Sequence, residues 1–205
     1  MPTVDLLVLA GGRGARLGGR DKAALTVAGR PLLDRVLDAA PVLGGRVVVV
    51  GDTVVPDGVL RTLEDPSDGG PVAGIAAGLA ALGAGAPWVA VVAVDQPGAA
   101  GALEALVGAV AEVGVDVDAI SHEDAEGHRQ WLLALYRREA LEGALAGLGE
   151  ARHTSVRRLV ADLRWRTVAA GAEHVGDVDT WADAEGWERR LGSVTIAMDR
   201  PDLEE

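Results

Sequence analysis

The chain has 205 residues, of which 49% are hydrophobic, so it is long enough to bury the core of one domain, and its lack of cysteine excludes disulfides and thiolate chemistry. A net charge of −12 argues against nucleic acid as a partner, and an anionic ligand would need a local group of cations. No apolar run reaches the ~18 residues of a membrane helix and no signal-type segment is visible, so we expect a cytoplasmic protein without membrane contact.

The first predicted element is the apolar run Leu6–Ala10, which ends at Gly11-Gly12. Apolar residues that do not alternate with polar ones predict a strand buried on both faces, as in a parallel sheet, and such sheets bind ligands beyond the carboxyl ends of their strands. The loop that follows is rich in cations: Arg13, Arg16, Arg20 and Lys22. Glycine amides and basic side chains suit a polyphosphate, and the alternative is an ordinary surface loop.

Two familiar phosphate-binding loops do not fit this stretch. The dinucleotide pattern G-x-G-x-x-G would start at Gly12 and needs glycine where Leu17 stands. A P-loop needs Gly-Lys-Ser/Thr before a helix, whereas Lys22 precedes Ala23 and a strand-like segment.

After this loop, helical and strand-like segments alternate. The expected elements are a helix from Pro31 to about Ala40, a strand over Arg46–Val50, a helix entered from the loop at 69–71, a strand over Trp88–Val94 and a helix over Leu103–Val113. Residues 54–63 are too irregular to assign. The pattern indicates an α/β domain.

A carboxylate follows the third apolar run directly, in Asp95-Gln96-Pro97. At the carboxyl end of a buried strand Asp95 would stand at a ligand-binding edge, where Mg²⁺ prefers one or two carboxylates together with phosphate oxygens. A turn-forming aspartate before proline is the structural alternative.

The second half begins with a predicted hairpin over residues 116–136, with its turn near Glu126-Gly127. The elements expected after it are a helix over 155–163 capped by Thr154 or Ser155, a strand over Trp165–Ala169, a helix over Trp181–Leu191 with Thr180 as N-cap, and a strand-like Val194–Met198. The four histidines show no ligand spacing, so we expect them to be solvated or hydrogen bonded.

The first loop also carries a known signature, L-A-G-G-x-x-x-R-hydrophobic-G-x-x-K. It is matched at Leu9, Ala10, Gly11, Gly12, Arg16, Leu17, Gly18 or Gly19, and Lys22. On these residues the chain resembles the molybdenum cofactor guanylyltransferase group of nucleotidyltransferases. Weaker similarities occur over 69–79, at Asp95-Gln96-Pro97, over 130–136 and over 176–180, so the resemblance covers residues 4 to about 191.

The resemblance implies that GMP is moved from Mg²⁺-bound GTP to the phosphate of a molybdopterin-type cofactor, with release of pyrophosphate. It implies these roles: Arg16 and Lys22, helped by Arg13, hold the triphosphate; Leu9, Ala10, Gly11 and Gly12 contact the nucleotide; Asp65 contacts the nucleoside; Asp95 and Asp179 bind the metal. Arg16, Lys22 and Asp95 are the expected catalytic residues. Transient contact with other cofactor-biosynthesis proteins is also implied.

Several alternatives stay open. Relatives often have a polar residue where Val50 ends the second strand, so cytidylyl transfer to the same cofactor is the nearest one. A sugar-phosphate nucleotidyltransferase or a non-catalytic nucleotide-binding regulator are the others. For the fold, we expect a single α/β domain over residues 1–191, with a mostly parallel twisted sheet and helices on both faces, and a tail over 192–205.

Overall fold

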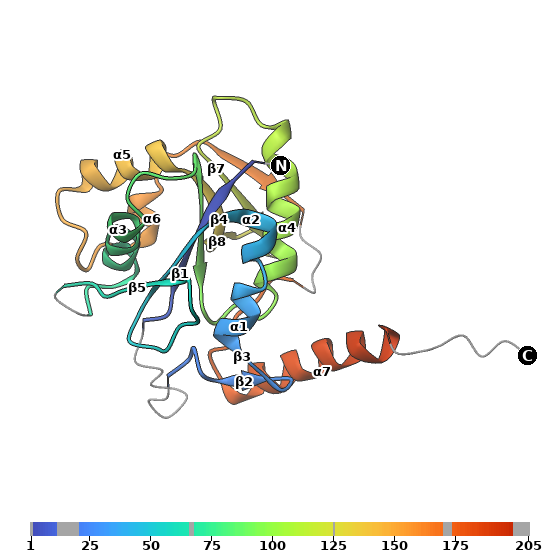
Figure 1. The fold of residues 1–205 in the computed structure, drawn as a ribbon. Helices are drawn as coiled ribbons and strands as arrows, with labels where there is room; N and C mark the ends of the chain where they lie inside the picture. Colours follow the sequence, from blue (N-terminus) through green and yellow to red (C-terminus); the bar gives the residue numbers. More distant parts are fainter. Residues whose placement is uncertain (1, 12–20, 66–67, 125, 170–173, 199–205) are drawn as a thin grey trace, which may run out of the picture.

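The computed structural model describes residues 2–11, 21–65, 68–124, 126–169 and 174–198, and for 193–198 the backbone only. A seven-stranded sheet in the order β5-β4-β1-β6-β8-β7-β9 forms its centre (Figure 1). Its strands are β1 (Val4–Leu9), β4 (Gly44–Val50), β5 (Leu60–Thr62), β6 (Trp88–Ala93), β7 (Ala119–Glu123), β8 (Arg129–Arg137) and β9 (Trp165–Val168). β8 is antiparallel to both neighbours, and the other pairings are parallel.

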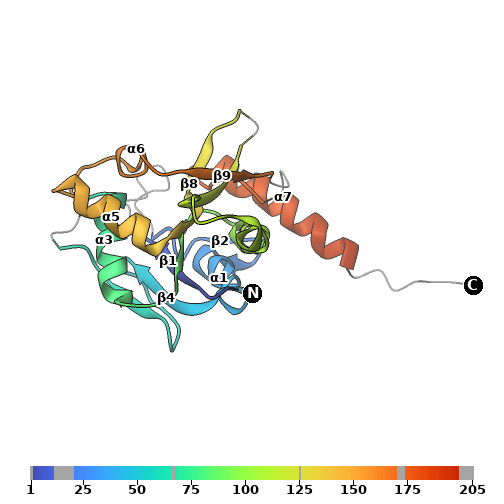
Figure 2. The same ribbon diagram turned by 90° about the horizontal axis from the view of Figure 1, so that it is seen from above.

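Helices cover both faces of this sheet (Figures 1 and 2). The helices are α1 (Leu32–Leu37), α2 (Ala40–Leu43), α3 (Pro71–Leu82), α4 (Ala99–Ala109, followed by a 3₁₀ turn over Val110–Glu112), α5 (Arg138–Leu148), α6 (Val156–Leu159) and α7 (Trp181–Met198). One face packs against α1, α2 and α4, and the other against α3, α5 and α6. A short ribbon of β2 (Thr26–Val27) and β3 (Arg30–Pro31) lies beside α7.

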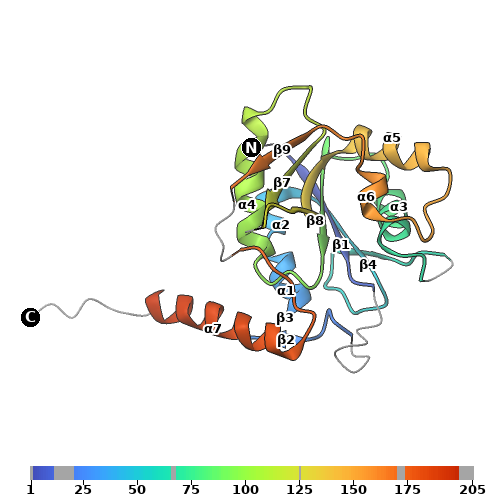
Figure 3. The same cartoon turned by 180° about the vertical axis from the view of Figure 1, so that it is seen from behind.

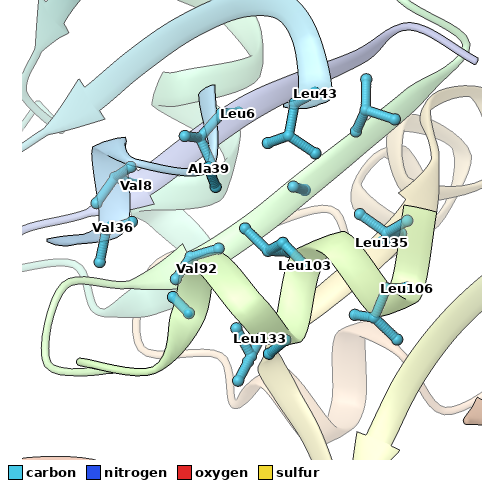
Figure 4. Packing of buried hydrophobic residues seen from close by; sticks show 14 of the residues in the cluster. Leu6, Val8, Val36, Ala39, Leu43, Val92, Leu103, Leu106, Leu133 and Leu135 are labelled. Atoms are coloured by element: carbon cyan, nitrogen blue, oxygen red, sulfur yellow. The ribbon is translucent and has the colours of Figure 1, made fainter. Parts of the chain in front are cut away.

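Strand β1 shows why its sequence has no polar alternation. Leu6 and Val8 point into the core cluster beneath α1 and α4 (Figure 4), whereas Leu7 and Leu9 point into the cluster beneath α3. Both side-chain rows are therefore removed from water, as in a sheet covered on two faces. This confirms the predicted α/β domain with a mostly parallel sheet, and the β7–β8 hairpin is its expected antiparallel part.

The structure corrects the prediction for the last segment. Val194–Met198 is not a strand, because α7 continues through Met198 and leads away from the sheet (Figure 3). β-branched residues suggested a strand, but a helix already begun elongates at little cost. Its start is fixed by a reciprocal pair, in which Asp183 N–H donates to Thr180 Oγ1 (3.2 Å) and Thr180 N–H donates to Asp183 Oδ2 (2.7 Å).

Other differences concern length and omission. The helix expected over 155–163 is limited to α6, whose N-cap is Ser155, and the sequence patterns did not predict β5 or α5. Among the described residues, no helix is long and apolar enough to cross a membrane.

Candidate active site

A cavity of about 500 Å³ opens where β1, β4 and β6 end. Residues from these strand ends, from β8, from the start of α3 and from three loop segments line it: Leu9, Gly11, Lys22, Val50, Glu64, Asp68, Gly70, Pro71, Gly74, Ala93, Val94, Asp95, Leu132 and Asp179. The carboxyl edge of a parallel sheet is the place where α/β proteins bind ligands. The cavity therefore lies where the sequence predicted it.

One end of the cavity is charged. Lys22 Nζ lies 2.9 Å from Asp95 Oδ2 and 2.7 Å from Asp179 Oδ1, so two carboxylates 84 residues apart in the sequence meet on one ammonium. The chain places them by different means. Asp95 follows β6 directly, and Asp179 is drawn to the same edge because the N–H of Val178 donates to the carbonyl of Asp95 over 2.9 Å. Val178 is fully buried against Trp187 of α7, which anchors this segment.

The charged groups at this end shift the pKa values of one another. Burial lowers the pKa of Lys22, but the hydrogen bonds and charges of Asp179 and Asp95 outweigh it and raise that pKa. Burial and the nearby carboxylates of Asp179 and Asp95 raise the pKa of Asp177. The carboxylates of Asp95, Asp179 and Asp177 thus lie near one another at this edge. Converging carboxylate oxygens fit a hard divalent cation such as Mg²⁺.

The backbone beside Lys22 is held by hydrogen bonds to the side chain of Asp21. The carboxylate of the preceding residue, Asp21, accepts the N–H of Ala23 (2.9 Å) and the hydroxyl of Thr53 (2.9 Å). Thr53, which lies in the turn after β4, is 9% exposed. These bonds fix the backbone on both sides of Lys22 relative to the sheet.

The opposite end of the cavity is mainly apolar, with Leu9, Val50 and Gly74 in its wall, and it carries two acidic residues, Glu64 and Asp68. Glu64 Oε1 accepts the N–H of Gly69 at 3.1 Å. Asp65, the expected nucleoside contact, is exposed and is not part of the cavity lining.

The structure thus brings together Lys22, Asp95 and Asp179 around a cavity that Leu9 and Gly11 also line. Ala10 is buried beside them, with its N–H donating to the carbonyl of Val50. Gly12, Arg13 and Arg16 lie outside the described residues. Sequence patterns missed Glu64 and Asp68, and the only available signal was that both flank the segment in which Asp65 was chosen.

Two histidines are placed as the sequence suggested. His122 is buried, and its ring nitrogens lie 3.0 Å from the carbonyl oxygens of Val168 and Ala102. His128 is exposed at the hairpin turn, where its ring and the carboxylates of Asp124 and Glu126 lie within 4.8 Å of one another. Two of these three side chains are exposed, and nothing else among the described residues marks the group as a site.

Comparisons with known proteins agree with this architecture. The family model for the MobA-like NTP transferase domain matches residues 6–170. Molybdenum cofactor guanylyltransferase from Cereibacter sphaeroides is 42% identical over 98 residues, covering 44% of this chain and 49% of that protein. The protein of the same name from Acidiphilium cryptum is 34% identical over 196 residues, covering 89% of this chain and 92% of that protein. For most of the curated relatives, the match spans about half of their length.

Among solved structures, molybdopterin-guanine dinucleotide biosynthesis protein A from Archaeoglobus fulgidus superposes with a TM-score of 0.67 at 21% identity, covering 93% of this chain and 100% of that chain. At this identity the likeness supports the fold alone. The family match includes β1 through β9, and with them Lys22 and Asp95. This chain belongs to the MobA-like NTP transferase domain family.

Proposed function

We propose that this protein is a Mg²⁺-dependent nucleotidyltransferase that moves GMP from GTP to the phosphate of a molybdopterin-type cofactor. The observation that carries the proposal is the convergence of Asp95 and Asp179 on Lys22 at the edge of the cavity. The names of the relatives, molybdenum cofactor guanylyltransferase, support the choice of donor and acceptor.

In the proposed reaction, an oxygen of the acceptor phosphate forms a bond to the α-phosphorus of GTP. The bond between the α-phosphorus and the bridging oxygen breaks, and pyrophosphate leaves with the electron pair. Bound Mg²⁺ would neutralise charge on the phosphate oxygens. No covalent enzyme intermediate is required, so the protein contributes position and charge.

Each residue of the charged end has a task in this scheme. Asp95 and Asp179 would hold the metal, and Lys22 would exchange its carboxylate partners in part for phosphate oxygens. Lys22 is 16% exposed and stands at the cavity wall, so it can reach a ligand without a change of fold. Arg13 and Arg16 are proposed to assist from the preceding loop. Cytoplasmic location and transient contact with other cofactor-biosynthesis proteins stay predictions.

The test is direct detection of the product. The purified protein is incubated with GTP, CTP or ATP, with Mg²⁺ and with molybdopterin, and the dinucleotide is detected by mass spectrometry. We expect a guanine dinucleotide and pyrophosphate with GTP, and no product after chelation of the metal. Product from CTP instead of GTP would support the cytidylyl alternative, and product with a sugar phosphate as acceptor would support the sugar nucleotidyltransferase alternative. Binding of GTP without product from any acceptor would favour the non-catalytic regulator.

A further inference from the structure

The carboxylate of Glu64 lies at the end of the cavity opposite the charged group. Glu64 follows β5, the edge strand of the sheet, whereas Asp95 follows β6. Three strand spacings separate β5 from β6 in the sheet order, which is about 14 Å. A nucleotide whose phosphates lie at Lys22 and Asp95 would therefore extend its base toward Glu64.

The carboxylate of Glu64 lies among mainly apolar groups. A methyl group built on Gly74 would meet Leu9 Cδ2 at 2.9 Å, Glu64 Oε2 at 3.3 Å and Val50 Cγ1 at 3.7 Å. The carboxylate thus stands in a wall formed by aliphatic carbons and by the bare backbone of α3. Within the described part of the chain, no arginine or lysine forms an ion pair with Glu64. A carboxylate in such a wall gains from a ligand that brings hydrogen-bond donors.

One oxygen of this carboxylate is already fixed. Glu64 Oε1 accepts the N–H of Gly69, so the orientation of the group is set before any ligand enters. Each carboxylate oxygen has a further lone pair, and the two oxygens together can accept two adjacent N–H groups. A methyl group built on Gly70 would meet nothing within 4 Å, and Gly70 and Glu64 both line the cavity.

We propose that Glu64 selects guanine as the base of the nucleotide, an inference that rests on the proposed function. Guanine presents two neighbouring donors on one edge, the N1–H and the exocyclic amino group, and a carboxylate can accept both. Adenine and cytosine present one amino group beside a bare ring nitrogen, whose lone pair would face the negative charge. Glu64 therefore attracts one base and repels two. Val50, which has no polar group, need not take part.

The experiment compares the affinities of different nucleotides for the same variant. A loss of folded protein affects all of these affinities equally and cancels in their ratio. Dissociation constants for GTP, inosine triphosphate, ATP and CTP are measured by calorimetry with Mg²⁺ for the unmodified protein and for Glu64→Gln. Inosine triphosphate keeps the N1–H and lacks the amino group. We expect the unmodified protein to favour GTP over inosine triphosphate by about tenfold or more, since a hydrogen bond to a charged group is lost. In Glu64→Gln this ratio should fall towards one.

Two further variants sharpen the comparison. Glu104→Gln makes the same chemical change on the exposed side of α4, and it should leave the ratio as it is in the unmodified protein. Asp65→Asn tests the residue that the sequence favoured. If Asp65→Asn brings the ratio of the dissociation constants for inosine triphosphate and GTP towards one and Glu64→Gln does not, Glu64 does not select the base. Equal weakening of all four nucleotides by Glu64→Gln, or a preference of the unmodified protein for CTP, also overturns the proposal.

The assay separates this inference from the proposed reaction. Guanine dinucleotide made by a Glu64→Gln protein with an unchanged base ratio leaves the reaction standing and removes the role of Glu64. A base ratio that depends on Glu64, in a protein that makes no dinucleotide, leaves guanine selection standing and removes the transfer reaction.

Discussion

The two ends of β1 carry ion pairs that are built in opposite ways. At the amino end, Asp5 and Arg138 lie 2.6 Å apart with side chains that are 2% and 9% exposed. At the carboxyl end, Lys22 is shared by Asp95 and Asp179, whose side chains are 20% and 43% exposed. Charged side chains thus lie at both ends of the strand. We call the buried pair of Asp5 and Arg138 the closed pair, and the partly exposed Lys22, Asp95 and Asp179 the open group.

The closed pair of Asp5 and Arg138 makes several further hydrogen bonds within the protein. Asp5 also accepts the N–H groups of Arg46 (2.8 Å) and Ala86 (3.1 Å), and Arg138 donates to the carbonyls of Ala86 (2.8 Å) and Gly83 (3.1 Å). These bonds tie together the ends of β1, β4, β6 and β8. Because both side chains are buried and bonded mainly to the protein itself, the network serves the structure.

The open group is different because its side chains are partly exposed and border a cavity. A metal ion and phosphates can therefore exchange with these partners. The comparison shows that an ion pair indicates function when it is partly exposed at a cavity, and indicates structure when it is buried and bonded mainly to the backbone of the protein.

The largest effect is expected at the closed pair. Arg138→Leu would remove the nearest cation from the buried carboxylate of Asp5 and leave only Arg46 Nη2 at 3.9 Å, so the free energy of unfolding should fall by about 3–5 kcal/mol. Denaturant unfolding monitored by circular dichroism measures this change. Arg30→Ala, which breaks the half-exposed pair with Asp38, is the control and should cost about 0–1 kcal/mol. Arg138→Leu should leave kcat/KM per folded molecule unchanged. A large loss of kcat/KM would show that the closed pair also contributes to activity.

The next effect concerns the two carboxylates of the open group. Asp95→Asn and Asp179→Asn should each lower kcat/KM by about 10²–10³ while stability changes little, because each removes a charge that acts on the reacting phosphates. Since both meet at one point, the double variant should be little worse than the weaker single variant. Steady-state kinetics with varied Mg²⁺ measures the losses. Strictly multiplicative losses would show that the two carboxylates do not share a metal.

Lys22→Ala should lower kcat/KM for the triphosphate at least tenfold, since losing a charge-assisted hydrogen bond costs about 1.5–3 kcal/mol. The same change removes the ammonium that Asp95 and Asp179 share. Divalent metal alone should therefore raise the melting temperature more in Lys22→Ala than in the unmodified protein. A smaller shift than in the unmodified protein would mean that lysine and metal do not compete for these carboxylates.

Much of this edge could be predicted because parallel strands end together. Runs such as Leu6–Ala10 and Trp88–Val94 have no alternation, since both their faces are buried, and this fixed the sheet type. Once strand ends share an edge, the loop after β1 lies at the same edge as Asp95. The family signature then singled out Lys22 within that loop. The position of Asp179 came from the family resemblance, and the structure shows its cause in the bond from Val178 to β6.

The end of the cavity at Glu64, where we propose that the nucleobase binds, could not be predicted in the same way. Whether Glu64 or Asp65 faces the cavity depends on how the three-residue strand β5 pairs with β4, and a segment this short has no periodicity to read. Helix α5 was missed because it follows β8 directly, with no glycine or proline to mark the boundary. The start of α7 after Thr180 was predicted, but its continuation past Leu191 was not, because Val194–Met198 was interpreted as strand-like.

The smallest effect is expected at Thr53, which contacts the residue preceding Lys22 and does not line the cavity. Its hydroxyl donates to Asp21, and Asp21 in turn accepts the N–H of Ala23, so the pair fixes the backbone that carries Lys22. Thr53→Val keeps the shape of the side chain and removes this bond. A hydrogen bond of this kind contributes about 1 kcal/mol, so KM for GTP should rise about fivefold with little change in kcat. Steady-state kinetics checks this, and Thr53→Ser should restore the original KM.

The decisive measurement is a double-mutant cycle with Lys22→Ala. If Thr53 acts through Lys22, then Thr53→Val should add almost nothing once the ammonium is gone, because there is no cation left to position. If the two losses simply multiply, Thr53 supports the fold of the turn after β4 and has no part in placing Lys22. In that case the melting temperature of Thr53→Val should fall by the same amount in both backgrounds, whereas a positioning role predicts that the coupling is seen in KM.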